Sequence, residues 1–225
     1  MQSYVDKAED YFSHARKEIA PFLPAQCGRV LEIGCGSGAT LNWLRHDRAA
    51  SFTVGVEIFE AAAQSARVCA DAVYCLDYEK GELPLESGEF DVILCLDVLE
   101  HMVDPWQVIT RLVSKHLVEG GTLIVSLPNV RYFSVVLPLL FLGRWDYQEE
   151  GVLDRTHLRF FTRNTAVRLL SHDQLECVRC IGFGTDWPSL KSVLNVLTAG
   201  FFREILTYQY VLAARKIHRP KSAES

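Results

Sequence analysis

VLEIGCGSG, residues 30–38, is a short apolar run that ends in three alternating glycines. An unbroken apolar run bounded by glycine predicts a buried strand that feeds a tight turn. Leu41 and Leu44 follow at helical spacing, so we expect a strand over 29–33, a glycine turn and a helix over 40–45. Glycine lets the backbone approach a ligand closely, and the helix directs its N–H groups and its positive dipole end toward the turn. An anionic group of a ligand is therefore expected at this turn.

Strands and helices alternate on both sides of this unit. The expected elements up to residue 129 are strands over 52–56, 72–76, 90–96 and 122–127, and helices over 4–21, 59–71 and 105–116. Gly120 and Gly121 are expected to form the turn into the strand over 122–127. The expected later elements are a helix over 163–172, strands over 176–183 and 207–216, and a loop and helix over 184–203. Apolar strands that alternate with helices predict an α/β fold whose parallel sheet is covered on both faces.

The composition limits the class of protein and of partner. The net charge is −5 and the chain has no long run of Lys or Arg, so we do not expect it to bind nucleic acid through phosphate contacts. The longest apolar run, 133–142, is too short to span a bilayer, which takes about 20 residues. The N-terminus carries no secretory signal, and the seven cysteines are odd in number and scattered. We expect a cytoplasmic protein with reduced thiols and no transmembrane segment, and no metal site, since the CxxC pair at 177–180 has no second pair to complete one.

Two carboxylates are expected beside the glycine turn, because parallel strands end at one edge of their sheet. Glu57 ends the second strand, where a carboxylate can accept hydrogen bonds from both hydroxyls of a ribose. Glu32 lies just before the glycines, where it would repel a pyrophosphate and attract an ammonium group. The sequence also has no Tyr-x-x-x-Lys pair for short-chain hydride transfer. These features favour a positively charged nucleoside over NAD, although residues 34–39 also fit the G-x-G-x-x-[GA] pattern of dinucleotide enzymes, and a turn without a ligand stays open.

These motifs resemble those of class I S-adenosylmethionine-dependent methyltransferases, in order, over residues 29–129. Residues 30–38 resemble the family's first motif, and Glu57 resembles its ribose-binding acid. Asp77 is similar to the residue that contacts the adenine amino group, FDVILCLDVLEH over 90–101 resembles the fourth-strand motif, and GGTLIV over 120–125 resembles the turn into the fifth strand. The resemblance implies a Rossmann-like three-layer sandwich with a seven-stranded, mostly parallel sheet whose last strand is antiparallel. It also implies that S-adenosyl-L-methionine is the cofactor, that S-adenosyl-L-homocysteine is the product, and that both are held by Glu32, Gly34, Cys35, Gly36, Gly38, Glu57, Ile58, Asp77, Tyr78, Cys95, Leu96 and Asp97.

The segment after residue 126 carries a narrower resemblance. LPNVR over 127–131 and GVLDRTHLRFFT over 151–162 are similar to a subgroup that tailors glycans and other small molecules and is related to the ubiquinone O-methyltransferase type. It implies methylation of an oxygen of a small molecule or saccharide, with nitrogen and carbon acceptors left open. LDVL over 96–99 differs from the Asn/Asp-Pro-Pro-Tyr/Phe motif of methyltransferases that act on exocyclic nitrogens of nucleic acids. The alternative is a non-catalytic protein that binds S-adenosylmethionine and serves as the partner or regulator of another enzyme.

Two histidines are candidates for a general base. Methyl transfer from a sulfonium is an in-line displacement, and a hydroxyl nucleophile is helped by a base of near-neutral pKa, a role that suits histidine. His101 follows the fourth strand close to the expected methyl position, and His157 lies in the segment expected to fold over the mouth of the site. His157 is favoured, with Asp154 beside it. Structural roles stay open: His101 as a helix cap or pocket wall, and His157 as a loop residue pinned by a hydrogen bond with Asp154.

We expect a single domain over 1–225. Its parts are a cofactor-binding half over 29–129, a lid or substrate segment over 130–172, the final strands over 173–217 and a tail over 218–225.

The apolar stretch 133–142, with Trp145 and Tyr147, has several possible roles. It could form a lid over the site, a peripheral contact with a membrane surface or lipid carrier, a homodimer surface, or a helix packed on the sheet. A set of arginines in the same half could bind an anionic substrate such as a nucleotide sugar. They are Arg131, Arg144, Arg155 and Arg159.

Overall fold

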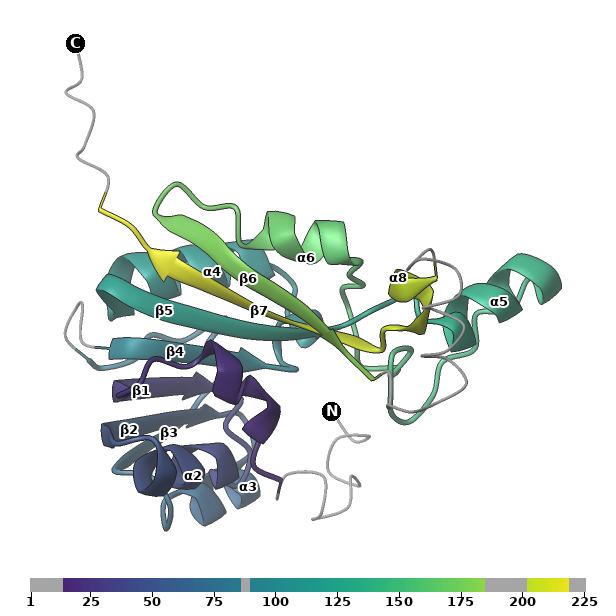
Figure 1. Cartoon of the computed structure of the whole chain (residues 1–225). Helices are drawn as coiled ribbons and strands as arrows, with labels where there is room; N and C mark the ends of the chain where they lie inside the picture. Colours follow the sequence, from purple (N-terminus) through teal and green to yellow (C-terminus); the bar gives the residue numbers. More distant parts are fainter. Residues whose placement is uncertain (1–13, 86–89, 185–201, 219–225) are drawn as a thin grey trace.

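A seven-stranded sheet forms the middle layer of the protein (Figure 1), whose computed structural model describes residues 14–85, 90–184 and 202–218. The strand order is β3-β2-β1-β4-β5-β7-β6, and β7 is antiparallel to both of its neighbours while the other pairs are parallel. The strands are β1 Gly28–Ile33, β2 Ala50–Glu57, β3 Ala72–Cys75, β4 Phe90–Leu96, β5 Leu117–Pro128, β6 Leu175–Phe183 and β7 Gln209–Lys216. The predicted sheet, with its antiparallel last strand, is confirmed.

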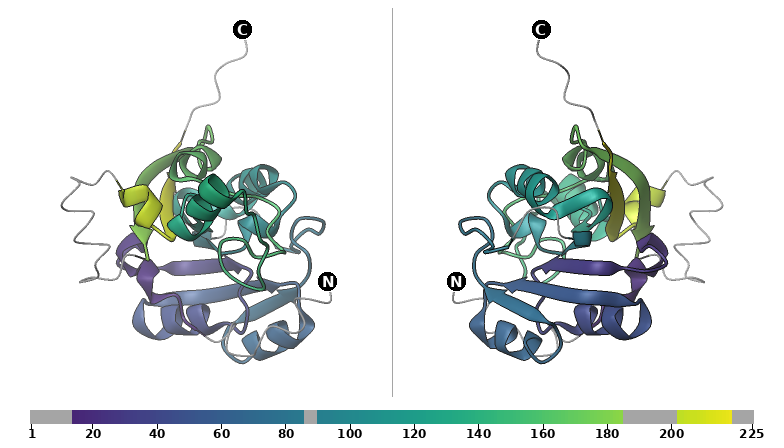
Figure 2. Two further views of the ribbon diagram at one scale, coloured as in Figure 1. Left: turned by 90° about the vertical axis from the view of Figure 1, so that its right-hand side faces the viewer. Right: turned by 90° about the vertical axis from the view of Figure 1, so that its left-hand side faces the viewer.

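Helices cover both faces of this sheet, as the two side views in Figure 2 show. One face packs against η2 (Lys17–Phe22), α2 (Ala39–Asp47) and α3 (Glu60–Ala66). The other face packs against α4 (Pro105–Arg111), the π-helix η4 (Leu112–His116) and α6 (Arg163–Leu169). Side chains of β1 and β4 alternate between the two cores, with Val30 and Leu94 on one face and Leu31 and Ile93 on the other. The three-layer sandwich is therefore also confirmed.

Several predicted element boundaries are corrected. The helix over 4–21 is described from residue 14 on, and its described part is the 3-10 helix η2, which contains Pro21. The helix over 59–71 ends at Ala66, and the helix over 105–116 changes from α to π at Leu112. Of the loop and helix over 184–203, residues 185–201 lie outside the described residues, and the chain resumes at α8, Arg203–Leu206.

The glycine pair 120–121 lies inside β5 and is not a turn that precedes it. β5 begins at Leu117, which pairs with Phe90, and the next pair joins Thr122 to Val92, so the extra residues form a bulge. Gly120 has φ +77°, a left-handed conformation that glycine adopts without the steric cost of a Cβ. The glycines therefore shape the entrance of a strand that starts earlier than the sequence indicated.

The order of the strands reverses between β1 and β4, which defines where a ligand binds in an open α/β sheet. Chain order runs outward from β1 through β2 to β3 on one side and from β4 to β5 on the other. In the register of the sheet, Ile33 pairs with both Val56 and Cys95. The glycine turn, Glu57 and the end of β4 consequently lie at one edge.

The helix α5, Phe133–Leu142, reaches out beyond this edge beside α8 (Figure 1). Val135 is its buried residue and packs with Val152 and Leu153. Of the roles left open for this stretch, packing on the sheet does not fit, because its outer side chains are 43% to 73% exposed. They are Leu137, Leu139, Leu140, Phe141 and Leu142.

Candidate active site

The glycine turn and the carboxylate of Glu57 are joined by hydrogen bonds. The backbone N–H of Gly36 donates to Oε2 of Glu57 at 2.9 Å, and the N–H groups of Ile58 and Phe59 donate to Oε1 at 2.8 and 3.0 Å. Gly34, Gly36 and Gly38 all have positive φ. A Cβ at Gly34 would lie 2.9 Å from Cγ2 of Val98, so a side chain there would strain the turn and crowd the end of β4. The result is a bare backbone surface with a nearly buried carboxylate beside it.

Glu32, the second-last residue of β1, is buried, and one of its carboxylate oxygens has no hydrogen-bond partner among the described residues. Its Oε2 makes no hydrogen bond within the part of the chain that the structure describes. Burial raises the pKa of Glu32 to about 8, with the neighbouring charge of Glu57 adding to the rise and that of Arg16 opposing it. Buried carboxylates are normally paired or hydrogen-bonded, so this oxygen is suited to a positively charged ligand group.

Two predicted cofactor residues, Cys35 and Cys95, are packed in the interior. A Cβ at Gly55 would lie 2.5 Å from Sγ of Cys35, so this thiol fills the space that the glycine leaves on β2. Burial raises the pKa of both thiols. All seven cysteines of the chain are free thiols. The predicted roles of Cys35 and Cys95 in holding a cofactor consequently depend on the backbone around them.

The three predicted cofactor residues that follow β2 and β3 have different surroundings. Ile58 follows Glu57 and is 45% exposed, at the rim of the turn. Asp77 accepts a hydrogen bond from the N–H of Glu79 at 3.0 Å, and its other oxygen pairs with Lys80 at 2.7 Å. Tyr78 points elsewhere: the guanidinium carbon of Arg111 lies 4.1 Å from the centre of its ring, and both line a separate cavity of about 180 Å³.

Asp97, directly after Leu96 at the end of β4, has φ +52°, which is rare for a residue with a side chain. Its Oδ1 accepts hydrogen bonds from Ser126 Oγ at 2.8 Å and from the amide of Gln209. Its Oδ2 is paired with the guanidinium of Arg16. Sequence reasoning missed Arg16, because nothing in the sequence around it indicates that the first segment crosses to this edge.

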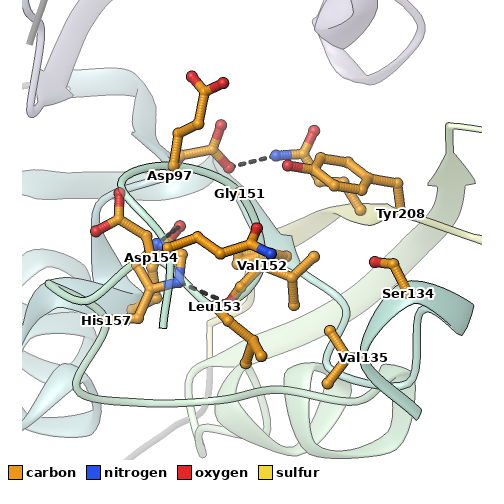
Figure 3. Close-up of a pocket in the computed structure, with 14 residues that line it drawn as sticks. Asp97, Ser134, Val135, Gly151, Val152, Leu153, Asp154, His157 and Tyr208 are labelled. Carbon is orange, nitrogen blue, oxygen red and sulfur yellow. Dashed lines mark hydrogen bonds and ion pairs between the residues drawn. The ribbon is translucent and has the colours of Figure 1, made fainter. Parts of the chain in front are cut away.

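A cavity of about 520 Å³, called the large cavity from here on, opens beside Asp97 (Figure 3). Asp154 and His157 lie on one side of it, and Ser134 and Tyr208 lie on another. Its wall is completed by Glu100, Pro128, Val135, Gln148, Glu150, Gly151, Val152, Leu153 and Gln209. Residues from the fourth-strand motif and from the 151–162 segment thus meet at one hollow.

The two predicted histidines lie against each other, with ring centroids 4.7 Å apart. Nδ1 of His157 is 3.0 Å from the carbonyl oxygen of Val152. Nδ1 of His101 is 3.2 Å from the carbonyl oxygen and 3.1 Å from Oγ1 of Thr156. Asp154 accepts hydrogen bonds from Oγ1 and N of Thr156 at 2.6 and 2.8 Å, so Asp154 holds the threonine that contacts His101.

Glu100 is a site residue that sequence reasoning missed. It is buried, with Oε1 4.0 Å from Nε2 of His157, and its Oε2 makes no hydrogen bond within the described residues. Burial raises its pKa well above the usual value, and the nearby charge of Asp97 adds to the rise. Its position directly before the candidate base His101 could have indicated that Glu100 belongs to the site. Glu100, His101 and His157 each offer a ligand atom, and these atoms lie within 4.8 Å of one another, so they could hold a metal ion that the sequence gave no reason to expect.

The predicted arginine cluster is dispersed. Arg131 is paired with Glu204, Arg155 pairs with Glu149 at 2.7 Å, and Arg159 donates to the carbonyl oxygen of Val103. Among the described residues that line the large cavity, none is an arginine. The geometry therefore gives no support to recognition of an anionic substrate by these four side chains.

Comparison with known proteins places this geometry in context. The sequence family described as a methyltransferase domain matches residues 4–179. The ubiquinone biosynthesis O-methyltransferase of Pseudomonas aeruginosa is 33% identical over 138 residues, which are 54% of this chain and 57% of the relative. The chain thus spans little more than half the length of the curated relatives that it matches first.

Solved structures share the architecture. A S-adenosylmethionine-dependent methyltransferase from Mesorhizobium loti superposes with a TM-score of 0.63 at 20% identity, covering 94% of this chain and 100% of that one. A SAM-dependent methyltransferase from Archaeoglobus fulgidus gives 0.63 at 18% identity, covering 93% and 95%. At these identities the likeness shows the fold.

Proposed function

The chain belongs to the methyltransferase-domain family, with the class I fold of S-adenosylmethionine-dependent enzymes, and from this premise we propose that it transfers the methyl group of S-adenosylmethionine to a hydroxyl oxygen of a small molecule or saccharide. The observation that carries the proposal is the meeting of Glu57, the bare glycine turn and the unpaired oxygen of Glu32 at one sheet edge. A nucleoside with a charged amino-acid group matches all three features.

The residues of this edge fit the cofactor group by group. A carboxylate offers about four lone-pair sites, and three N–H groups use three of them at Glu57, so Oε2 keeps about one site that can accept from a ribose hydroxyl. The ammonium of the amino-acid end would pair with Glu32. Arg16 is a cation near Glu32 and would bind the carboxylate of that end. Asp77 would accept from the adenine amino group. Bound here, the cofactor supplies a methyl group that its sulfonium makes electrophilic.

The large cavity is the proposed acceptor site. Its wall joins Asp97, beside the cofactor edge, to Asp154 and His157. Holding the acceptor oxygen in line with the methyl group can lower the activation free energy by about 7 kcal/mol or more in well-oriented systems. As the new C–O bond forms, the C–S bond breaks and its electron pair stays on sulfur, which leaves S-adenosylhomocysteine. The hydroxyl proton must leave the acceptor.

The imidazole pair is proposed to make the acceptor oxygen nucleophilic. Either imidazole could take the proton as a general base, or both could hold a cation that lowers the pKa of the hydroxyl. Replacing His157 or His101 by alanine is expected to lower kcat by about 100- to 10,000-fold, while the affinity for S-adenosylmethionine changes little, because the proposed cofactor contacts are made by Glu32, Glu57 and the glycine turn.

Single-turnover assays against a panel of phenols, catechols and saccharides would measure this, with calorimetry of cofactor binding in parallel. His46→Gln, an exposed change on α2, is the matched control. Full turnover by both alanine variants would remove the imidazole pair from the mechanism. Cofactor binding without turnover on any acceptor would favour the regulator over the enzyme.

The exposed face of α5 is proposed to contact a membrane surface that presents an apolar acceptor. The relatives are named for ubiquinone biosynthesis, and the first turn of α5, at Ser134 and Val135, lines the proposed acceptor cavity. Arg144, Trp145 and Tyr147 follow the helix, a combination of basic and aromatic residues that is common at membrane interfaces. None of the described helices is long and apolar enough to cross a bilayer. A cytoplasmic location stays a prediction.

The double change Leu140→Asp and Phe141→Asp tests this contact. We expect the variant to lose flotation with phosphatidylglycerol vesicles and to keep its melting temperature, because both side chains are about 70% exposed (69% and 73%). Flotation equal to that of the wild type would contradict the proposal. A change from dimer to monomer in sedimentation, with no vesicle binding by either protein, would assign the face to a second copy of the chain.

A further inference from the structure

Three side chains at the large cavity are arranged as ligands of a cation: Glu100 and His157 line its wall, and His101 lies against His157. Ligand atoms of Glu100, His101 and His157 all lie within 4.8 Å of one another, and Glu100 and His157 are buried. The fold fixes this arrangement, because the segment after Asp154 runs along η3, Leu99–His101. The N–H groups of Leu158 and Arg159 both donate to the carbonyl oxygen of Glu100, at 2.8 and 3.0 Å.

Hydrogen bonds to backbone oxygens set which nitrogen of each imidazole carries the lone pair. A carbonyl oxygen only accepts, so Nδ1 of His157 must donate to Val152, which leaves the lone pair on Nε2. Oγ1 of Thr156 donates to Asp154, so it accepts from Nδ1 of His101, and the carbonyl oxygen of Thr156 requires the same donor. Metal-binding histidines are typically oriented in this way, with the second ring nitrogen bonded to a carbonyl or a carboxylate-linked group.

The carboxylate of Glu100 completes the set. Its Oε1 faces Nε2 of His157 at 4.0 Å, which is too long for a hydrogen bond. The separation is about 0.6 Å longer than the spacing of roughly 3.4 Å between two ligand atoms that a tetrahedral ion holds by bonds of about 2.1 Å. Its Oε2 is buried, and within the described chain it has no hydrogen-bond partner. A carboxylate kept in such a place is usually paired or coordinates a metal.

We propose that Glu100, His101 and His157 bind a divalent transition-metal ion, for which Zn²⁺ is the best match among common ions. Two imidazoles and one carboxylate are a zinc ligand set, and a fourth position left open is typical of catalytic zinc. Ligand atoms around a tetrahedral zinc lie about 3.4 Å apart, so small rotations of the three side chains complete the site.

This proposal rests on the proposed methyl transfer and gives its acceptor site a chemical preference. Glu100 and His157 line the cavity together with Asp97 and Asp154, so an acceptor in that cavity would reach an ion held by them. A hydroxyl bound there would have a lowered pKa and would release its proton to water before the oxygen attacks the methyl group. Acceptors with two adjacent hydroxyls, such as catechols or vicinal diols, can chelate the ion and are the preferred class.

Calorimetry of the full chain after dialysis against EDTA tests the site without any activity measurement. We expect one equivalent of Zn²⁺ to bind, and Co²⁺ to give the visible absorption of a low-symmetry N/O site. Glu100→Gln and His157→Gln should each weaken binding at least 10-fold. Thr156→Val, which removes the link between Asp154 and His101, should weaken it about 10- to 100-fold, as changes behind a ligand do.

His46→Gln is the matched control and should bind like the wild type. The proposal is overturned if the wild type takes up no stoichiometric Zn²⁺ or Co²⁺, or if Glu100→Gln and His157→Gln bind as tightly as the wild type. S-adenosylmethionine titrated into the same samples separates the two proposals. Cofactor binding without metal binding would overturn the metal site alone, and absence of cofactor binding would overturn the methyl transfer.

Discussion

Replacement of Glu57 by glutamine is expected to weaken the binding of S-adenosylmethionine by about 100-fold or more. Hydrogen bonds to a charged group contribute about 1.5–3 kcal/mol each, and this carboxylate is proposed to accept one from the ribose. It also holds the turn, since the N–H groups of Gly36, Ile58 and Phe59 all donate to it. The amide of glutamine would turn an N–H₂ group toward at least one of these donors.

The matched control is Glu60→Gln, a change of the same kind at an exposed carboxylate on α3 that pairs with Arg67. Calorimetry with S-adenosylmethionine and S-adenosylhomocysteine measures both variants, and the melting temperature separates loss of binding from loss of fold. An affinity of Glu57→Gln within threefold of the wild type would show that this carboxylate does not hold the nucleoside.

Replacement of Glu32 by glutamine is expected to have opposite effects on binding and on stability. The variant loses the proposed partner of the ammonium group, so we expect cofactor affinity to fall by about 10- to 100-fold, a cost of about 1.5–3 kcal/mol. The cofactor-free variant should be more stable than the wild type at alkaline pH, because glutamine stays neutral where Glu32 must ionise in a buried place.

The direction of this stability change follows from the pKa of Glu32, which is about 8 in the folded protein against a usual value of 4.5. The folded state holds this proton more tightly than the unfolded state, so its stabilising effect is complete below pH 4.5 and is lost progressively as the pH rises to about 8. The loss of folding stability is of the order of 5 kcal/mol, and the glutamine variant does not undergo it.

Urea denaturation of the cofactor-free protein at pH 5 and pH 9 measures this linkage. The wild type should lose more free energy of unfolding between the two values than Glu32→Gln, and Glu60→Gln should behave like the wild type. An equal loss in all three proteins would mean that Glu32 is ionised in the folded state, paired with a group such as Arg16.

The cofactor edge was predictable because the features that build it are local. A strand, a glycine turn and a helix follow one another in 28–47, and the parallel sheet then brings the end of β2 beside them without further information. The register of β1 against β2 and β4 is set by apolar side chains that are buried on both faces. Glu32 and Glu57 could therefore be assigned to one edge from the sequence.

Contacts between distant segments were not predictable in the same way. Arg16 reaches Asp97 from a segment with no motif, and the 3-10 geometry that carries it there contains Pro21, which removes a backbone donor. Glu100 reads as an ordinary acid in the sequence, and its burial depends on the later segment that closes over it through Leu158. Tyr78 follows the predicted adenine contact, yet its ring turns toward Arg111 because space beside α4 accepts it.

The placement of the stretch 133–142 was also not predictable from the sequence. Its composition is that of a core helix, and packing on the sheet was one of the expected outcomes. The faces of the sheet are already covered by α2, α3, α4 and α6, so this helix extends beyond the edge (Figure 1). Apolar content predicts that a surface will be covered, and it does not identify what covers it.

Direct titration of the purified protein with S-adenosylmethionine tests the central claim, that a carboxylate pair and a bare glycine turn bind a cationic nucleoside. We expect saturable binding of one molecule per chain, competition by S-adenosylhomocysteine, and loss of that binding in Glu57→Gln. Absence of binding at millimolar cofactor, in protein that melts cooperatively and binds NADH instead, would contradict it.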